Sequence, residues 1–163
     1  MKKILCLAAI ACMALFVSCE KEDIHHTGDL TGNLYGVWFL TGKSETYPNT
    51  SGDKASYTED FTVHHFYLVL SEFPFPHAVG KKGSLSALDL DDVDVDAVRF
   101  TYDANKHKIN FKKTIWLSDE LLTRNMILKG TFDVTELSET QLILEQYESL
   151  TGKTVGYIYR RQE

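Results

Sequence analysis

The densest group of side chains that could bind a metal ion is a run of aspartates in the middle of the chain. Its members are Asp89, Asp91, Asp92, Asp94 and Asp96. The last three have the spacing that opens a calcium-binding loop, which also needs glycine at its sixth position and a bidentate glutamate at its twelfth. Those positions hold Ala97 and Asp103. This mismatch, and the valines that alternate with the acids, favour a solvated edge strand or turn over a calcium site.

The histidines are not spaced to share a metal ion. His64 and His65 are adjacent in an expected strand, so their side chains would point to opposite faces, one buried and one exposed. His25 and His26 lie in a polar linker with no third ligand nearby. The chain has no glycine-rich phosphate loop, no Gly-x-Ser-x-Gly elbow and no His-Glu-x-x-His motif. We therefore predict no metal, no cofactor and no catalytic residue.

Cys19 is the residue whose chemistry the sequence indicates most directly. Two lysines and an uncharged apolar run over residues 4–17 precede it, and Ser18 stands immediately before it. The run is too short to span a bilayer, which needs about 20 apolar residues. The arrangement resembles the lipobox of bacterial lipoproteins. The resemblance implies that residues 1–18 are a removed signal peptide and that lipid on Cys19 anchors the chain; an ordinary secretory peptide or a buried N-terminal helix is the alternative.

The residues that follow Cys19 indicate where the anchored chain would lie. Residues 19–23 read Cys-Glu-Lys-Glu-Asp and resemble the surface-export signal of Bacteroidota lipoproteins. This resemblance implies an outer-membrane lipoprotein whose domain is exposed on the cell surface, with a periplasm-facing domain as the alternative. Residues 19–32 are polar and contain glycine, so we expect a flexible tether.

The mature chain has the size and charge of one acidic domain. It contains 145 residues, with 15 basic and 23 acidic side chains, so its formal charge is −8. A charge of this sign repels phosphate backbones and argues against binding to nucleic acid. Cys6 and Cys12 leave with the signal peptide, so the folded domain has no thiol for a disulfide or a thiolate metal site.

Short runs of alternating apolar residues, separated by turn residues, predict strands throughout the domain. The clearest places Met126, Leu128, Phe132 and Val134 on one face, with Gly130 as a kink among them. The expected strands cover residues 35–41, 61–70, 98–102, 108–112, 126–134, 142–147 and 155–160. Strands this short, with one wet face, predict an antiparallel all-β domain that forms a barrel or a sandwich.

Two long polar segments, residues 44–60 and 71–82, are expected to be loops. The second contains Phe73 and Phe75, each followed by proline. These rings either form an exposed contact patch or fold over one end of the domain as a plug, and we favour the plug.

Gly36 and Trp38 form a Gly-x-Trp motif at the start of the first expected strand. The motif resembles that of the lipocalin (calycin) superfamily, and of the lipocalin-like domains in short Bacteroidota lipoproteins. The resemblance implies an antiparallel up-and-down β-barrel over residues 33–163, in which the tryptophan closes one end and a basic residue near the C-terminus packs across its ring. Arg160 is our candidate for that residue, with Arg161 as the alternative. Lipocalins also carry a helix after the last strand and some calycins carry an Arg-x-Tyr clamp, and neither is present here.

A lipocalin-like barrel implies a non-enzymatic protein that binds a small apolar or amphipathic ligand in its interior. The residues expected to line that interior are Phe66, Phe100, Tyr102, Met126, Leu128, Phe132 and Tyr159. The alternative is a protein- or glycan-binding module without a cavity, in which residues 73–76 make the contact. A third class, a glycan hydrolase, would need two acids that face each other in a cleft.

Overall fold

A computed structural model of the chain describes residues 28–48, 54–84, 96–120 and 124–163. Cys19, the expected signal peptide and most of the aspartate run lie outside these residues. No helix in the described part has the length and hydropathy that crossing a bilayer requires.

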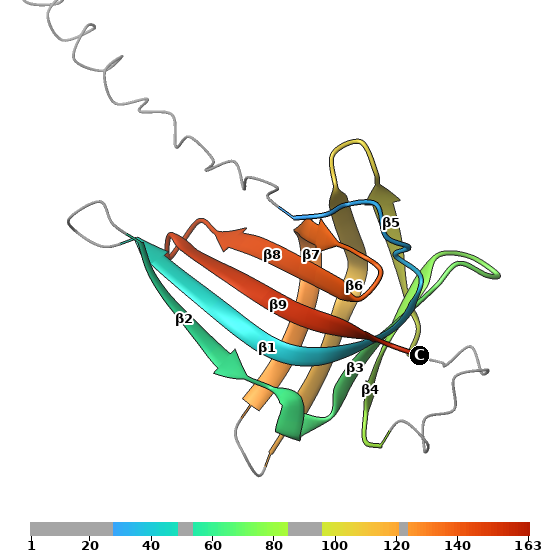
Figure 1. The fold of residues 1–163 in the computed structure, drawn as a ribbon, viewed down its shortest axis with the longest axis horizontal. Coiled ribbons are helices and arrows are strands. Elements are labelled where there is room, and N and C mark those ends of the chain that lie inside the picture. Colours follow the sequence, from blue (N-terminus) through green and yellow to red (C-terminus); the bar gives the residue numbers. More distant parts are fainter. Residues whose placement is uncertain (1–27, 49–53, 85–95, 121–123) are drawn as a thin grey trace, which may run out of the picture.

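The described residues form one antiparallel sheet that closes into a barrel (Figure 1). Its elements are β1 (Gly36–Pro48), β2 (Lys54–Asp60), a 3-10 turn η1 (Thr62–His64), β3 (Phe66–Ser71), β4 (His77–Lys82), β5 (Val98–Asp103), β6 (Lys108–Asp119), β7 (Arg124–Leu137), β8 (Gln141–Glu148) and β9 (Lys153–Gln162). The strand order is β2-β1-β3-β4-β5-β6-β7-β8-β9, and β1 also pairs with β9. The prediction of an all-β, antiparallel, up-and-down barrel is therefore confirmed.

β2 and β3 together occupy one strand position of the barrel, because they pair with successive parts of β1. Residues 42–48 of β1 pair with β2, and residues 36–39 pair with β3 on the same side. Between β2 and β3, η1 and the left-handed residue His65 interrupt the ladder. The sheet has nine strands, but the closed barrel has eight strand positions, because β2 and β3 share one of them.

The interior is built from the alternating apolar residues. Met126, Leu128, Phe132 and Val134 are buried on one face of β7, as expected. Gly130 lies among them with a φ of +78°, a backbone conformation that favours glycine. Aromatic rings also pack between neighbouring strands: the ring centroids of Phe111 on β6 and Phe132 on β7 are 5.9 Å apart.

Two expected segments fold differently. Residues 44–60 are largely the arms of the β1–β2 hairpin rather than a loop, and residues 71–82 contain β4. β2 is exposed along most of its length, so it lacks the apolar alternation that predicts a strand. The expected strand over 61–70 begins only at Phe66, because η1 occupies its first part. His64 is buried and His65 exposed, but η1 and the turn after it produce that difference, not strand alternation.

Phe73 and Phe75 do not plug the barrel. Phe73 is 86% exposed. Phe75 is half-buried beneath the Arg99 guanidinium, which lies 4.2 Å from the centre of its ring. The preference for a plug was wrong, because the arginine on the neighbouring strand covers one ring on the outer surface and leaves the other in solvent.

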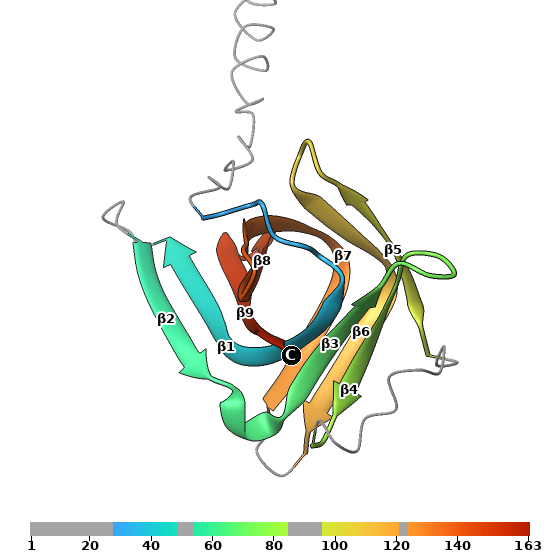
Figure 2. The same ribbon diagram turned by 45° about the vertical axis from the view of Figure 1, so that its right-hand side comes forward.

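The N-terminal segment lies along one end of the barrel (Figure 2). Gly28 and Gly32 donate backbone hydrogen bonds to Thr135 and Leu137 of β7, and Leu137 donates to Asp29. Residues 28–32, which we expected within the tether, therefore pack on the folded domain.

Trp38 is fully buried at this end of the barrel, and Arg161 covers its ring at 4.2 Å. The Arg161 guanidinium donates to the carbonyls of Asn33, Tyr35 and Glu139. Arg160 is exposed on the opposite face of β9. The choice of Arg160 was therefore wrong: the inward face of β9 carries Tyr157 and Tyr159, and alternation puts Arg161 on that face.

Gly36 makes room for this arginine. Its φ is +148°, and a Cβ at this position would overlap Nη1 of Arg161. The Gly-x-Trp motif and the C-terminal arginine thus form one packed unit, although more than 120 residues separate them in sequence.

Arg161→Ala is expected to lower the free energy of unfolding by about 2–3 kcal/mol, because it removes a cation–π contact and several charged hydrogen bonds. Denaturation in guanidinium chloride measures this loss. The matched variant Arg160→Ala should stay within about 0.5 kcal/mol of the parent chain. Equal losses in the two variants would contradict the assignment.

Gly36→Ala is expected to cost about 1–3 kcal/mol, because the new Cβ meets the guanidinium and the backbone conformation is strained. In the Arg161→Ala background the steric part should disappear, which leaves a smaller penalty. A double-mutant cycle measures this coupling. Strict additivity of the two substitutions would show that Gly36 and Arg161 do not share the space.

Candidate functional site

The residues expected to bind a ligand in the interior pack against one another instead. Six of the seven are at most 3% exposed and belong to one hydrophobic cluster. The Tyr159 hydroxyl donates to the Met126 sulfur at 3.1 Å, and burial raises the pKa of Tyr159 well above its usual value. Tyr102 is partly buried against the same cluster. These side chains form the core of the barrel.

The barrel wall opens on the side where β7 diverges from β8. β7 pairs with β8 only through residues 133–137, so residues 124–131 of β7 have no strand neighbour on that side among the described residues. On the other side of the gap lie the extended ends of β1, β8 and β9, which pair with one another and lean away from β6 and β7 (Figure 1). We call the space between these two groups of strands the splayed cleft.

Two side chains occupy the place of the missing strand along the β7 edge. The Tyr157 hydroxyl donates to the Ile127 carbonyl and accepts from the Ile127 N–H, at 3.0 and 3.2 Å. The Gln146 amide donates to the carbonyls of Lys129 and Thr131. Burial is the main cause of the raised pKa of Tyr157, so its hydroxyl stays protonated and able to donate.

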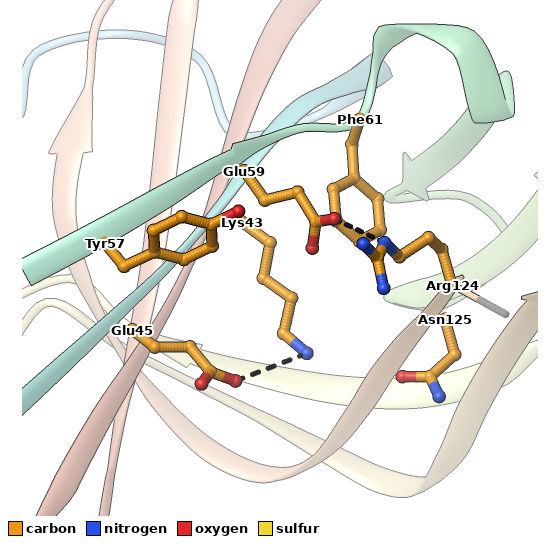
Figure 3. Close-up of a pocket in the computed structure, with 7 residues that line it drawn as sticks. All are labelled: Lys43, Glu45, Tyr57, Glu59, Phe61, Arg124 and Asn125. Carbon is orange, nitrogen blue, oxygen red and sulfur yellow. Dashed lines mark ion pairs between the residues drawn. The ribbon is translucent and has the colours of Figure 1, made fainter. Parts of the chain in front are cut away.

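The splayed cleft contains two adjoining pockets. The first has a volume of about 230 Å³ and is lined by Lys43, Glu45, Tyr57, Glu59, Phe61, Arg124 and Asn125 (Figure 3). The second has a volume of about 290 Å³ and is lined by Lys43, Asn125, Ile127, Lys129, Phe132, Gln146, Glu148, Lys153, Val155 and Tyr157. Because Lys43 and Asn125 line both, the pockets adjoin each other, and their summed volume is within the range of small-molecule sites, about 300–1,000 Å³.

The position of Lys43 and Glu45 follows from a bulge in β1. The register against β9 shifts between Leu40 and Gly42, and beyond it Lys43 pairs with Tyr157 and Glu45 with Val155. Tyr157 and Val155 face inward, so the bulge turns the two charged side chains into the cleft. Of the seven residues predicted to bind ligand, Phe132 is the one that also lines this cleft.

Charged groups in the cleft are mostly paired. A hydrogen bond from Tyr47, followed by the Lys153 ammonium, lowers the pKa of Glu45. Burial acts to lower the pKa of Lys153, but its hydrogen bond to Glu45 at 3.3 Å and the nearby Glu148 outweigh burial and raise it. Arg124 is paired with Glu59 across the gap between β7 and β2. Glu45 and Lys153 therefore both stay charged near neutral pH.

The histidines and acids elsewhere do not form a metal centre within the described ranges. His64 pairs with Asp119 at 3.4 Å, and Lys82 lies 3.7 Å from the same carboxylate. The pair ties η1 to the end of β6.

No family model, no curated protein and no solved structure matches this chain. The closed antiparallel barrel is consistent with a lipocalin-like fold, and that likeness rests on the geometry of the sheet.

Proposed function

We propose that this protein binds a small amphipathic ligand in the splayed cleft, without catalysis. The observation that supports this most directly is the composition of the cleft wall. Ile127, Val155 and Phe132 line one pocket, Arg124 lines the other, and Lys43 lines both. An apolar surface with a few convergent polar groups is typical of a ligand site.

The cleft suits this role better than the barrel centre does. The residues expected to contact a central ligand already fill their space with each other. A ligand there would have to displace a packed core, and removing such contacts costs several kcal/mol, on the order of 2–5 for each large side chain. The cleft is open to solvent and needs no such displacement.

We also propose that the domain is held at the outer membrane through lipid on Cys19 and exposed on the cell surface. The motif around Cys19 and the charged residues 20–23 support this. Stable anchoring needs two or more acyl chains, which a lipobox cysteine receives. An amphipathic ligand would then be bound next to the bilayer.

A second function is favoured by one observation. Phe73 is 86% exposed at the β3–β4 turn, and a ring in that position can anchor a protein partner or a glycan. Recovery of an envelope partner by the parent chain, but not by Phe73→Ala, together with no amphiphile binding, would support this function instead.

Ile127→Ser should weaken the binding of a dodecyl amphiphile, because Ile127 is 41% exposed and lines the cleft. We expect a loss of about 1 kcal/mol, or roughly fivefold in Kd. Calorimetric titration of the mature chain from residue 19, with Cys19→Ser to prevent lipidation, measures the affinity.

The matched control for this loss is Val63→Ser. Val63 is an exposed aliphatic residue that does not line either pocket of the cleft. Equal effects of the two substitutions would contradict a site in the cleft.

Cys19→Ser is expected to abolish incorporation of labelled fatty acid and to release the protein from the membrane fraction. Radiolabelling and fractionation of cells that express the full chain test this. A variant that remains membrane-bound without label would contradict lipid anchoring at Cys19.

A further inference from the structure

The splayed cleft has a charge opposite in sign to that of the whole protein. Its lining includes four cations, Lys43, Arg124, Lys129 and Lys153, and three acids, Glu45, Glu59 and Glu148. The cleft therefore carries a formal charge of +1, whereas the complete chain carries −6. This local excess matches a ligand with one negative charge.

Lys43 is the most loosely paired of the three cations in this cleft that have an acidic partner. Arg124 is held by Glu59, and Lys153 donates to Glu45 at 3.3 Å. The Lys43 ammonium lies 3.7 Å from Glu45, and within the described residues it donates no hydrogen bond. Its side chain is 21% exposed, so it faces the space shared by both pockets.

Asn125 offers a second donor at the same place. Its side-chain amide makes no hydrogen bond with the rest of the described chain, and it lines both pockets with Lys43. Figure 3 shows Lys43 and Asn125 entering the first pocket from opposite strands, β1 and β7. An ammonium and an amide N–H that meet where the two pockets adjoin can both donate hydrogen bonds to the oxygens of one anionic group.

The apolar part of the cleft starts from this junction. Ile127 and Val155 line the second pocket, and the Tyr157 ring lies beneath the Lys43 ammonium at 5.9 Å. An acyl chain that follows these residues would place its head group between Lys43 and Asn125.

We infer that the cleft binds an acyl carboxylate, whose head group accepts hydrogen bonds from the Lys43 ammonium and the Asn125 amide while its chain lies along Ile127 and Val155. This assignment rests on the proposed function and names its ligand class. A doubly charged phosphate fits less well, because Glu45 and Glu59 line the same pocket and Arg124 is already paired. A neutral head group leaves the net positive charge of the cleft lining without a compensating charge.

A chain-matched series of amphiphiles tests the inference. Dodecanoate, dodecyl phosphate, dodecyl maltoside and dodecyltrimethylammonium are titrated below their micelle concentrations into the mature chain that carries Cys19→Ser. Dodecanoate is expected to bind most tightly. Lys43→Met should weaken dodecanoate roughly tenfold, the scale of one lost charged hydrogen bond, and change dodecyl maltoside less than about twofold.

Three further variants separate the head-group site from general effects. Asn125→Ala should weaken dodecanoate about threefold, Lys43→Arg should retain the preference for carboxylate, and Lys112→Met removes an exposed lysine outside the cleft and should change nothing. The preference for carboxylate is the ratio of the affinities for two ligands, measured on one protein sample. Partial unfolding of a variant lowers both affinities alike, so it does not change this ratio.

The outcomes distinguish this inference from the function on which it rests. If dodecanoate and dodecyl maltoside bind equally, or if Lys43→Met weakens both alike, the carboxylate assignment is wrong and the cleft remains an amphiphile site. If no member of the series binds, the inference and the proposed function both fail.

Discussion

The contact between Arg161 and Trp38 is the interaction on which the rest of the barrel depends. The guanidinium stacks on a fully buried indole and donates to backbone carbonyls before β1 and in the turn between β7 and β8. It therefore ties the N-terminal segment, the last strand and a distant turn together at one end. Gly36 allows this approach because it has no side chain. With that end closed, the β1–β9 pairing completes the barrel.

The opposite parts of the same strands are free to diverge. β1 turns at its bulge, and β7 separates from β8 on the N-terminal side of Asp133. The wall of the barrel therefore opens where the closed end no longer constrains the strands. Tyr157 and Gln146 satisfy the exposed β7 edge with side-chain hydrogen bonds, which limits strand-to-strand aggregation there. The result is a barrel whose described core residues pack on one another, with a cleft at its side that both apolar and charged residues line.

The sequence predicted the fold better than it predicted the site. Alternation identified the inward face of β7, and the Gly-x-Trp motif identified the closed end, because both depend on local spacing. The same alternation, applied to β9, would have selected Arg161 over Arg160. The cleft was missed because Lys43 lies just after the expected strand over 35–41 and Glu45 lies in the expected loop over 44–60. The register against Tyr157 and Val155 shows that both face inward. A bulge is a property of strand pairing, which spacing along one strand does not reveal.

The position of a bound acyl chain tests the central claim most directly. Intermolecular NOEs between the chain protons of dodecanoate and the protein methyl groups would locate it. A ligand in the splayed cleft gives contacts to the methyls of Ile127 and Val155 and leaves the Leu128 and Met126 signals of the core unchanged. Contacts to Leu128 and Met126, without contacts to Ile127, would place the ligand inside the barrel and contradict this account.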